Sequence, residues 1–164
     1  MRKQIPVSAA LLLIACLSFT HAVKGQRFID KSYDKVLSGL KKYNPGNDST
    51  SVRFSNTDRT IRMEVGSKGS QPAIFEYIFD SNKKCISEKV TANCDSCHKK
   101  YLDELLSRKK FDWIRLNENQ YISAYKWKLM IELPVTEEKS LFYNLLKVDW
   151  NRETYAMLLE GRQK

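Results

Sequence analysis

The stretch VRFSNTDRTIRMEVGSKGSQPAIFEYIF, residues 52–79, alternates apolar and polar side chains in three short runs. A period of two is typical of β-strands with one buried face. The apolar members of the runs are Val52 and Phe54, then Ile61, Met63 and Val65, then Phe75, Tyr77 and Phe79. Turn-forming residues follow each run, so we expect sequential antiparallel strands. We expect a further short strand over residues 86–90.

Helical spacing flanks this block on both sides. Before it, apolar residues recur every three or four positions over residues 28–40, and Asn44-Pro45-Gly46 ends the run. We expect this helix to cover one face of the sheet. After the block, Asn93 is expected to cap a second helix that reaches about Arg108. Its apolar positions fall on one stripe and comprise Tyr101, Leu102, Leu105 and Leu106.

The second half of the chain repeats the strand pattern. We expect a strand over residues 111–116 and a long half-buried strand over residues 121–133, where aromatic and aliphatic side chains alternate with lysines and other polar residues. Residues 141–148 fit both the helical and the strand period, and we favour a strand. Asp149 or Asn151 should cap a terminal helix that Gly161 ends.

The expected order of elements is α-β-β-β-(β)-α-β-β-(β)-α. Strands and helices do not alternate strictly, as they would in a doubly wound parallel sheet. The sequence therefore predicts an α+β domain with one antiparallel sheet of about five to seven strands and three helices. Strands followed by a helix occur twice, over residues 52–108 and 111–160, which hints at a duplicated unit, although no residue motif repeats between the halves.

The N-terminus has the layout of a secretory signal. Met1-Arg2-Lys3 precedes a mostly apolar run over residues 5–19, and small residues follow. The run is too short to span a bilayer, which takes roughly 20 apolar residues. We expect residues 1–25 to be removed, or residues 1–22 if the cut follows Ala22, leaving one α+β domain over residues 26–164 as a soluble periplasmic or secreted protein. Leu13-Ile14-Ala15-Cys16 also matches a lipoprotein box, so lipid anchoring at Cys16 is an alternative.

The positive charge of the chain is spread rather than concentrated. The full chain of 164 residues has a formal net charge of +9. Arg2, Lys3 and Lys24 account for three of these charges and no acid precedes Asp30, so the expected mature chain has 9 − 3 = +6. Lysine pairs alternate with acids, unlike the dense stripe of a nucleic-acid-binding protein. We expect an unidentified protein, a glycan or an anionic partner, and no specific nucleic acid.

The motif Cys94-Asp95-Ser96-Cys97-His98 has CxxCH spacing, which resembles the haem-attachment motif of c-type cytochromes. The resemblance implies that Cys94 and Cys97 form thioether links to haem c and that His98 is the proximal iron ligand. His21 lies in the expected signal, so the sixth ligand would have to be Met63, Met130 or Met157, and we favour Met157. A periplasmic electron-transfer protein is therefore one alternative function.

The same cysteines allow two other interpretations. A CxxC at the start of a helix can act as a redox dithiol, with Cys94 as nucleophile and Cys97 as resolving thiol. We favour a structural disulfide from Cys85 to either Cys94 or Cys97. That bridge would link a strand to the helix, leave one odd thiol, and leave His98 exposed.

No arrangement typical of an enzyme stands out. The expected mature chain has a single histidine, so neither a hydrolytic triad nor a metal-ligand cluster is predicted, and we name no catalytic residues. Aromatic residues gather in the second half and comprise Trp113, Tyr121, Tyr125, Trp127, Tyr143 and Trp150. We expect most of them in the core, and some could stack on a ligand at a sheet edge. The sequence favours a binding or interaction protein over an enzyme.

Overall fold

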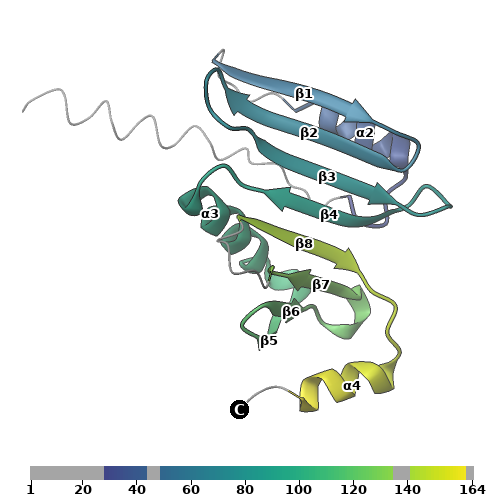
Figure 1. Cartoon of the computed structure of the whole chain (residues 1–164). Coiled ribbons are helices and arrows are strands. Elements are labelled where there is room, and N and C mark those ends of the chain that lie inside the picture. The colour runs from purple at the N-terminus through teal and green to yellow at the C-terminus, as the bar shows by residue number, and fades with distance from the viewer. Residues whose placement is uncertain (1–27, 44–48, 135–140, 162–164) are drawn as a thin grey trace, which may run out of the picture.

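A computed structural model describes residues 28–43, 49–134 and 141–161, and Figure 1 shows these residues as one large sheet with flanking helices. The α+β class is confirmed, but the sheet has eight strands, more than the five to seven predicted. The strands are β1 (Thr50–Asn56), β2 (Thr60–Ser67), β3 (Ala73–Phe79), β4 (Cys85–Thr91), β5 (Ile114–Asn117), β6 (Gln120–Ile122), β7 (Leu129–Glu132) and β8 (Phe142–Lys147). The helices are α2 (Tyr33–Lys41), α3 (Asp95–Leu106) and α4 (Arg152–Glu160), with short 3-10 helices η2 (Lys109–Phe111) and η3 (Tyr125–Trp127).

The sheet joins two four-stranded meanders. Its strand order is β1-β2-β3-β4-β8-β7-β6-β5, and every neighbouring pair is antiparallel. The last strands of the two meanders, β4 and β8, pair at the centre. In the chain, α3 follows the first meander and α4 follows the second. Each half therefore has the order of four strands and then a helix.

The first helix starts later than predicted. Residues 28–32 do not form its first turn, because Asp30 has a left-handed φ of 67° and the Asp30 N–H donates to the Cys85 carbonyl. Ser32 forms an isolated antiparallel bridge with Lys84. These backbone bonds tie the segment to the start of β4, and α2 begins only at Tyr33. The predicted end at Asn44-Pro45-Gly46 lies outside the described residues.

The predicted long strand over residues 121–133 is wrong. It is divided into β6 and β7 by η3, and Lys128 has a left-handed φ of 50°. The turn closes because the Ser123 N–H donates to the Leu129 carbonyl at 2.9 Å and the Leu129 N–H donates to Ser123 Oγ at 3.0 Å. The apolar alternation continues through this turn, which is why the sequence pattern resembled one strand. The strand predicted over residues 111–116 begins only at Ile114, after η2.

Helix caps account for the remaining boundaries. Cys94, rather than the predicted Asn93, is the N-cap of α3. Asn151 caps α4, with its side-chain oxygen accepting from the Thr154 N–H at 2.8 Å, and Gly161 follows the last turn. The strand interpretation of residues 141–148 is confirmed by β8.

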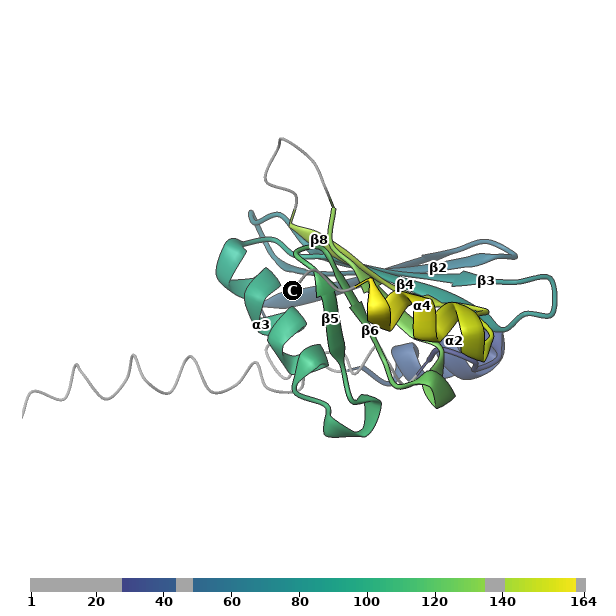
Figure 2. The same ribbon diagram turned by 90° about the horizontal axis from the view of Figure 1, so that it is seen from below.

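The two faces of the sheet carry separate apolar clusters. The face that bears Ile61, Tyr77 and Leu145, here called the inner face, packs against α2 and α3. The opposite, outer face bears Ile122 and Met130, which form a smaller cluster with α4 and Trp150. In Figure 2, α2 lies below β2 and β3, and no described helix lies above them. None of the described helices combines the length and the apolar character that crossing a bilayer requires.

Candidate functional site

The cysteine pairing differs from the favoured prediction. Cys94 forms a disulfide with Cys97, whereas Cys85 is a free, buried thiol. Cys85 begins β4 and Cys94 follows its end. Seven extended residues span roughly 20 Å, and bridged cysteines need Cα atoms within about 7 Å of each other. A bridge from Cys85 to the start of α3 therefore does not form in this fold.

The disulfide occupies the first turn of α3. Cys94 is extended at the N-cap, and its Sγ accepts the Cys97 N–H at 3.1 Å and lies 3.2 Å from Ser96 Oγ. Both cysteines are partly exposed. The free amide groups of a helix N-terminus stabilise negative charge on a nearby sulfur. A thiolate at Cys94 would receive this stabilisation after reduction.

His98 and Met157 do not converge. His98 is not the exposed residue predicted, because its Nε2 is buried and has no hydrogen-bond partner among the described residues. Its ring lies edge-on to Tyr143, with centroids 6.1 Å apart. Tyr143 belongs to the inner face, whereas Met157 is 65% exposed on α4, which packs on the outer face. The ligand pair implied by the haem resemblance is therefore not brought together, and the two sulfurs of its attachment motif are bonded to each other.

A buried carboxyl group lies on the inner face of the sheet, between Tyr77 and Leu145, and sequence reasoning missed it. Glu88 is 3% exposed, and its Oε2 has no hydrogen-bond partner within the described part of the chain. Glu88 faces inward because it pairs with Tyr77 across β3 and β4. A β-bulge between the two strands leaves Ile86 without a pairing partner, and Ile86 is exposed. The even spacing of Glu88 and Val90 was a signal that could have identified it.

Burial dominates the electrostatics of this carboxyl group. It raises the pKa of Glu88 to about 8, although the charge of Arg108 partly opposes the shift. Burial, with the charge of Glu88, also raises the pKa of the Cys85 thiol to about 12 and the pKa values of Tyr77 and Tyr143. Glu88 is therefore mostly protonated at neutral pH in the folded protein.

The strand registers arrange the outer face in rows that cross the sheet. One row pairs Ile114 with Ile122 and Ile122 with Met130, and this apolar row packs against α4. The next row is polar and consists of Asn117, Gln120, Glu132 and Asn144. Because α4 covers only the apolar row, the polar row borders a groove of about 650 Å³.

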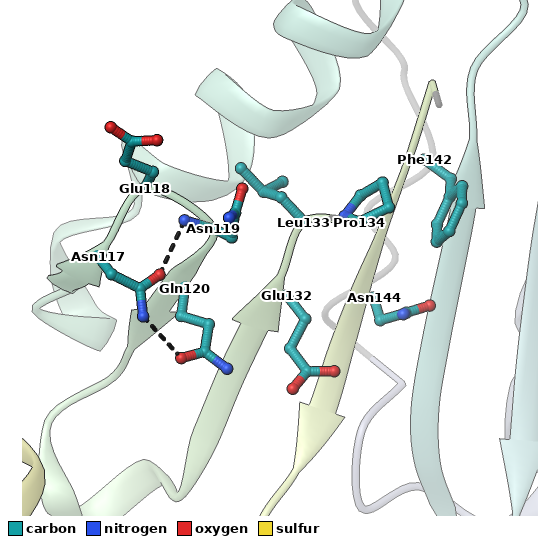
Figure 3. A pocket seen from close by; sticks show the side chains of 9 residues that line it. All are labelled: Asn117, Glu118, Asn119, Gln120, Glu132, Leu133, Pro134, Phe142 and Asn144. Atoms are coloured by element: carbon teal, nitrogen blue, oxygen red, sulfur yellow. Dashed lines mark hydrogen bonds between the residues drawn. The ribbon is translucent and has the colours of Figure 1, made fainter. Parts of the chain in front are cut away.

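The groove combines amides, carboxylates and one aromatic ring. Figure 3 shows Gln120, Glu132 and Asn144 in succession on neighbouring strands, with Pro134 and Phe142 at one side. The complete lining is Asn117, Glu118, Asn119, Gln120, Glu132, Leu133, Pro134, Phe142 and Asn144. This set was missed by sequence reasoning, because the row exists only when β5 to β8 are placed in register.

Some of these polar groups are satisfied and others are not. Asn117 donates to Gln120 Oε1 at 3.0 Å and accepts from the Asn119 N–H at 2.8 Å, which fixes the β5–β6 turn. Within the described residues, Glu132 and Asn144 form no side-chain hydrogen bond or ion pair, although both are only partly exposed. Lys89 Nζ lies 4.3 Å from the centroid of the Phe142 ring at the border of the groove. The groove therefore presents unused donors and acceptors beside an apolar surface.

Comparison with known proteins finds no matching family model, no similar curated protein and no similar solved structure.

Proposed function

We propose that this protein is an exported binding protein whose outer-face groove holds a neutral, hydroxyl-rich ligand, namely an oligosaccharide. The observation that carries the proposal is the row of Gln120, Glu132 and Asn144, in which the last two side chains have no partner in the described structure. Pockets of 300–1,000 Å³ with a few convergent polar groups are typical ligand sites. The proposal involves binding and no reaction.

The chemistry of the lining selects the ligand class. A side-chain amide offers both donors and acceptors, and a carboxylate offers acceptors, so together they match hydroxyl groups, which donate and accept. The Phe142 ring supplies an apolar surface on which a sugar ring can stack. Glu118 and Glu132 place two negative charges at the groove and Lys89 places one positive charge at its border, so the balance disfavours acidic polymers there.

Asn144→Ala is expected to weaken oligosaccharide binding about tenfold, because one or two hydrogen bonds to the ligand are lost. The probes are hexamers of β-glucose, xylose, mannose and α-glucose, with a hexagalacturonate as the anionic comparison. Binding is measured by calorimetry and by the shifts of the Gln120 and Asn144 side-chain amide signals.

The matched control is Asn82→Ala, which removes an exposed turn amide outside the groove. We expect it to bind the preferred hexamer within about twofold of wild type, consistent with surface changes away from a site. Failure of all four neutral hexamers to bind, or an equal loss in both variants, would contradict the proposal.

A second candidate function is thiol–disulfide exchange, and one observation favours it. Cys94 and Cys97 are bonded to each other at the N-terminus of α3, while Cys85 is buried elsewhere. In the reductive direction, a glutathione thiolate attacks Cys94 Sγ and displaces the Cys97 thiolate, which takes up a proton. A second glutathione thiolate then attacks the glutathione sulfur, which releases the Cys94 thiolate and oxidised glutathione.

The reduced protein is then expected to accelerate the reduction of insulin disulfides about tenfold over dithiothreitol alone, because a helix-terminal thiolate is more available at neutral pH. Cys94→Ser should abolish this acceleration. Cys85→Ala, which removes the free thiol, should preserve it. An inactive wild-type protein, or an active Cys94→Ser variant, would exclude this candidate.

A further inference from the structure

A second pocket lies on the opposite side of the sheet from the groove. It is bounded by α2 on one side and by η2 and η3 on the other, and its volume is about 640 Å³. Its apolar surface consists of Phe28, Ile29, Phe111, Trp127 and Leu129. All five residues belong to or pack against the inner-face cluster, so this surface continues the core outward.

Four lysines surround this apolar surface: Lys31, Lys35, Lys42 and Lys110. Lys35 is in α2 and Lys42 is its C-cap residue, two turns further on, and both lie on one stripe with Ser38 and Gly39, which also line the pocket. No ion pair in the described residues involves Lys31, Lys35 or Lys42. The only acid in the lining, Asp30, is paired with Lys147 at 2.7 Å. The rim is therefore strongly positive.

Specific contacts hold the walls of the pocket in place. A Cβ at Gly39 would come within 2.9 Å of Phe28 Cε1, so glycine allows the Phe28 ring to lie directly on α2. Phe28 also packs edge-to-face on Tyr77, with centroids 5.5 Å apart. On the other wall, Trp127 Nε1 donates to the Lys110 carbonyl at 2.7 Å. Lys110 Nζ lies 4.5 Å from the centroid of the Phe111 ring, which places a cation next to the apolar surface.

We propose that this pocket binds a single-chain amphiphile with an anionic head group. The alkyl chain lies on the aromatic surface, and a carboxylate or phosphate head lies among Lys31, Lys35 and Lys42. Charge complementarity selects this occupant, because a neutral chain would leave the lysines unused and a cationic one would be repelled. The N-terminal apolar run of the chain itself is a poor match, because residues 1–27 contain Arg2, Lys3, Lys24 and Arg27 and no acid.

This inference does not depend on the oligosaccharide groove, because the two pockets share no lining residue. The two sites lie on opposite faces of the sheet. Loss of binding at one site is therefore distinguishable from loss at the other. The groove variant Asn144→Ala also serves as a control here and should leave amphiphile binding unchanged.

The test uses four probes with the same eight-carbon chain: octyl phosphate, octanoate, octanol and octylammonium. The protein is titrated below micelle concentrations, and binding is followed by the indole N–H signal of Trp127. We expect both anions to bind about tenfold more tightly than octanol, because the anionic head group forms charge pairs with several of the pocket lysines at once. Octylammonium should bind more weakly than octanol. A preference between the two anions would distinguish a phosphate from a carboxylate source.

Charge-reversal variants on one helix locate the site. Lys35→Glu and Lys42→Glu should each weaken octyl phosphate binding about five- to tenfold, whereas Lys41→Glu should change it less than about twofold. Lys41 is a matched control because it is exposed on the same helix and does not line the pocket. The proposal is overturned if no probe shifts the Trp127 signal, if octanol binds as tightly as the anions, or if Lys41→Glu weakens binding as much as Lys35→Glu.

Discussion

The Glu88→Gln variant is expected to lose most of the pH dependence of stability that the wild-type protein shows between pH 5 and pH 8. Over that range this one group should lower the wild-type free energy of unfolding by about 3 to 4 kcal/mol as the pH rises. The cause is the burial of one carboxyl group on the inner face of the sheet, which raises the pKa of Glu88 from 4.5 to about 8.

The direction of the effect follows from proton linkage. Between these two pKa values, the folded protein keeps a proton on Glu88 that the unfolded chain releases. Raising the pH therefore favours the unfolded chain, and the stabilising contribution is fully present below pH 4.5 and lost as the pH rises through 8. Gln resembles the protonated acid in shape and carries no titratable group. The free energy of unfolding of the Glu88→Gln variant should therefore not fall with pH in this way.

The surroundings of Glu88 determine how the measurement is made. Glu88 contributes to the raised pKa values of Tyr77, Cys85 and Tyr143, and the charge of Arg108 lowers the pKa of Glu88 itself. Urea unfolding at pH 5, 6, 7 and 8 stays below the ordinary pKa of 9.0 of the Cys85 thiol in the unfolded chain. Glu160→Gln, an exposed change on α4, is the control and should keep the wild-type slope. An unchanged slope in Glu88→Gln would refute the assignment.

Leu105→Ala is expected to lower the free energy of unfolding by about 3 kcal/mol, through lost burial and the cavity left behind. Leu105 is 1% exposed and is the only residue of α3 that is fully buried. The backbone at this point also supports the core, because the Leu105 carbonyl accepts from Trp113 Nε1 at 3.0 Å. This one side chain therefore fixes much of the contact between α3 and the inner face.

Leu106→Ala provides the comparison at the next position. Leu106 is only partly buried against the same cluster, so we expect a loss of about 1 kcal/mol. Urea midpoints at constant slope measure both variants. Equal losses in the two variants would show that the contact of α3 with the sheet does not depend on Leu105.

Local patterns in the sequence were sufficient to predict most of the helices and strands. The period of two over residues 52–79 predicted β1, β2 and β3, and the apolar stripe around Leu105 predicted α3. These signals are local, because a side chain two or four residues away lies on the same face of a strand or helix. The same locality misled the interpretation of residues 121–133, where alternation continued through η3. The turn there is closed by hydrogen bonds between Ser123 and Leu129, and such bonds leave no periodic pattern of apolar residues in the sequence.

What the sequence determined by itself was the α+β class, three helices separated by sets of strands, and the CxxC at the start of α3, but not the number of strands in the second half. Only the tertiary structure decided which cysteines meet, which charges are buried and where cavities open. Cys85 and Cys94 are separated by the length of β4, and Glu88 faces inward because the register pairs it with Tyr77. The groove row exists because four strands pair in one register. These outcomes depend on distances between residues far apart in the chain, which residue types and their spacing do not specify.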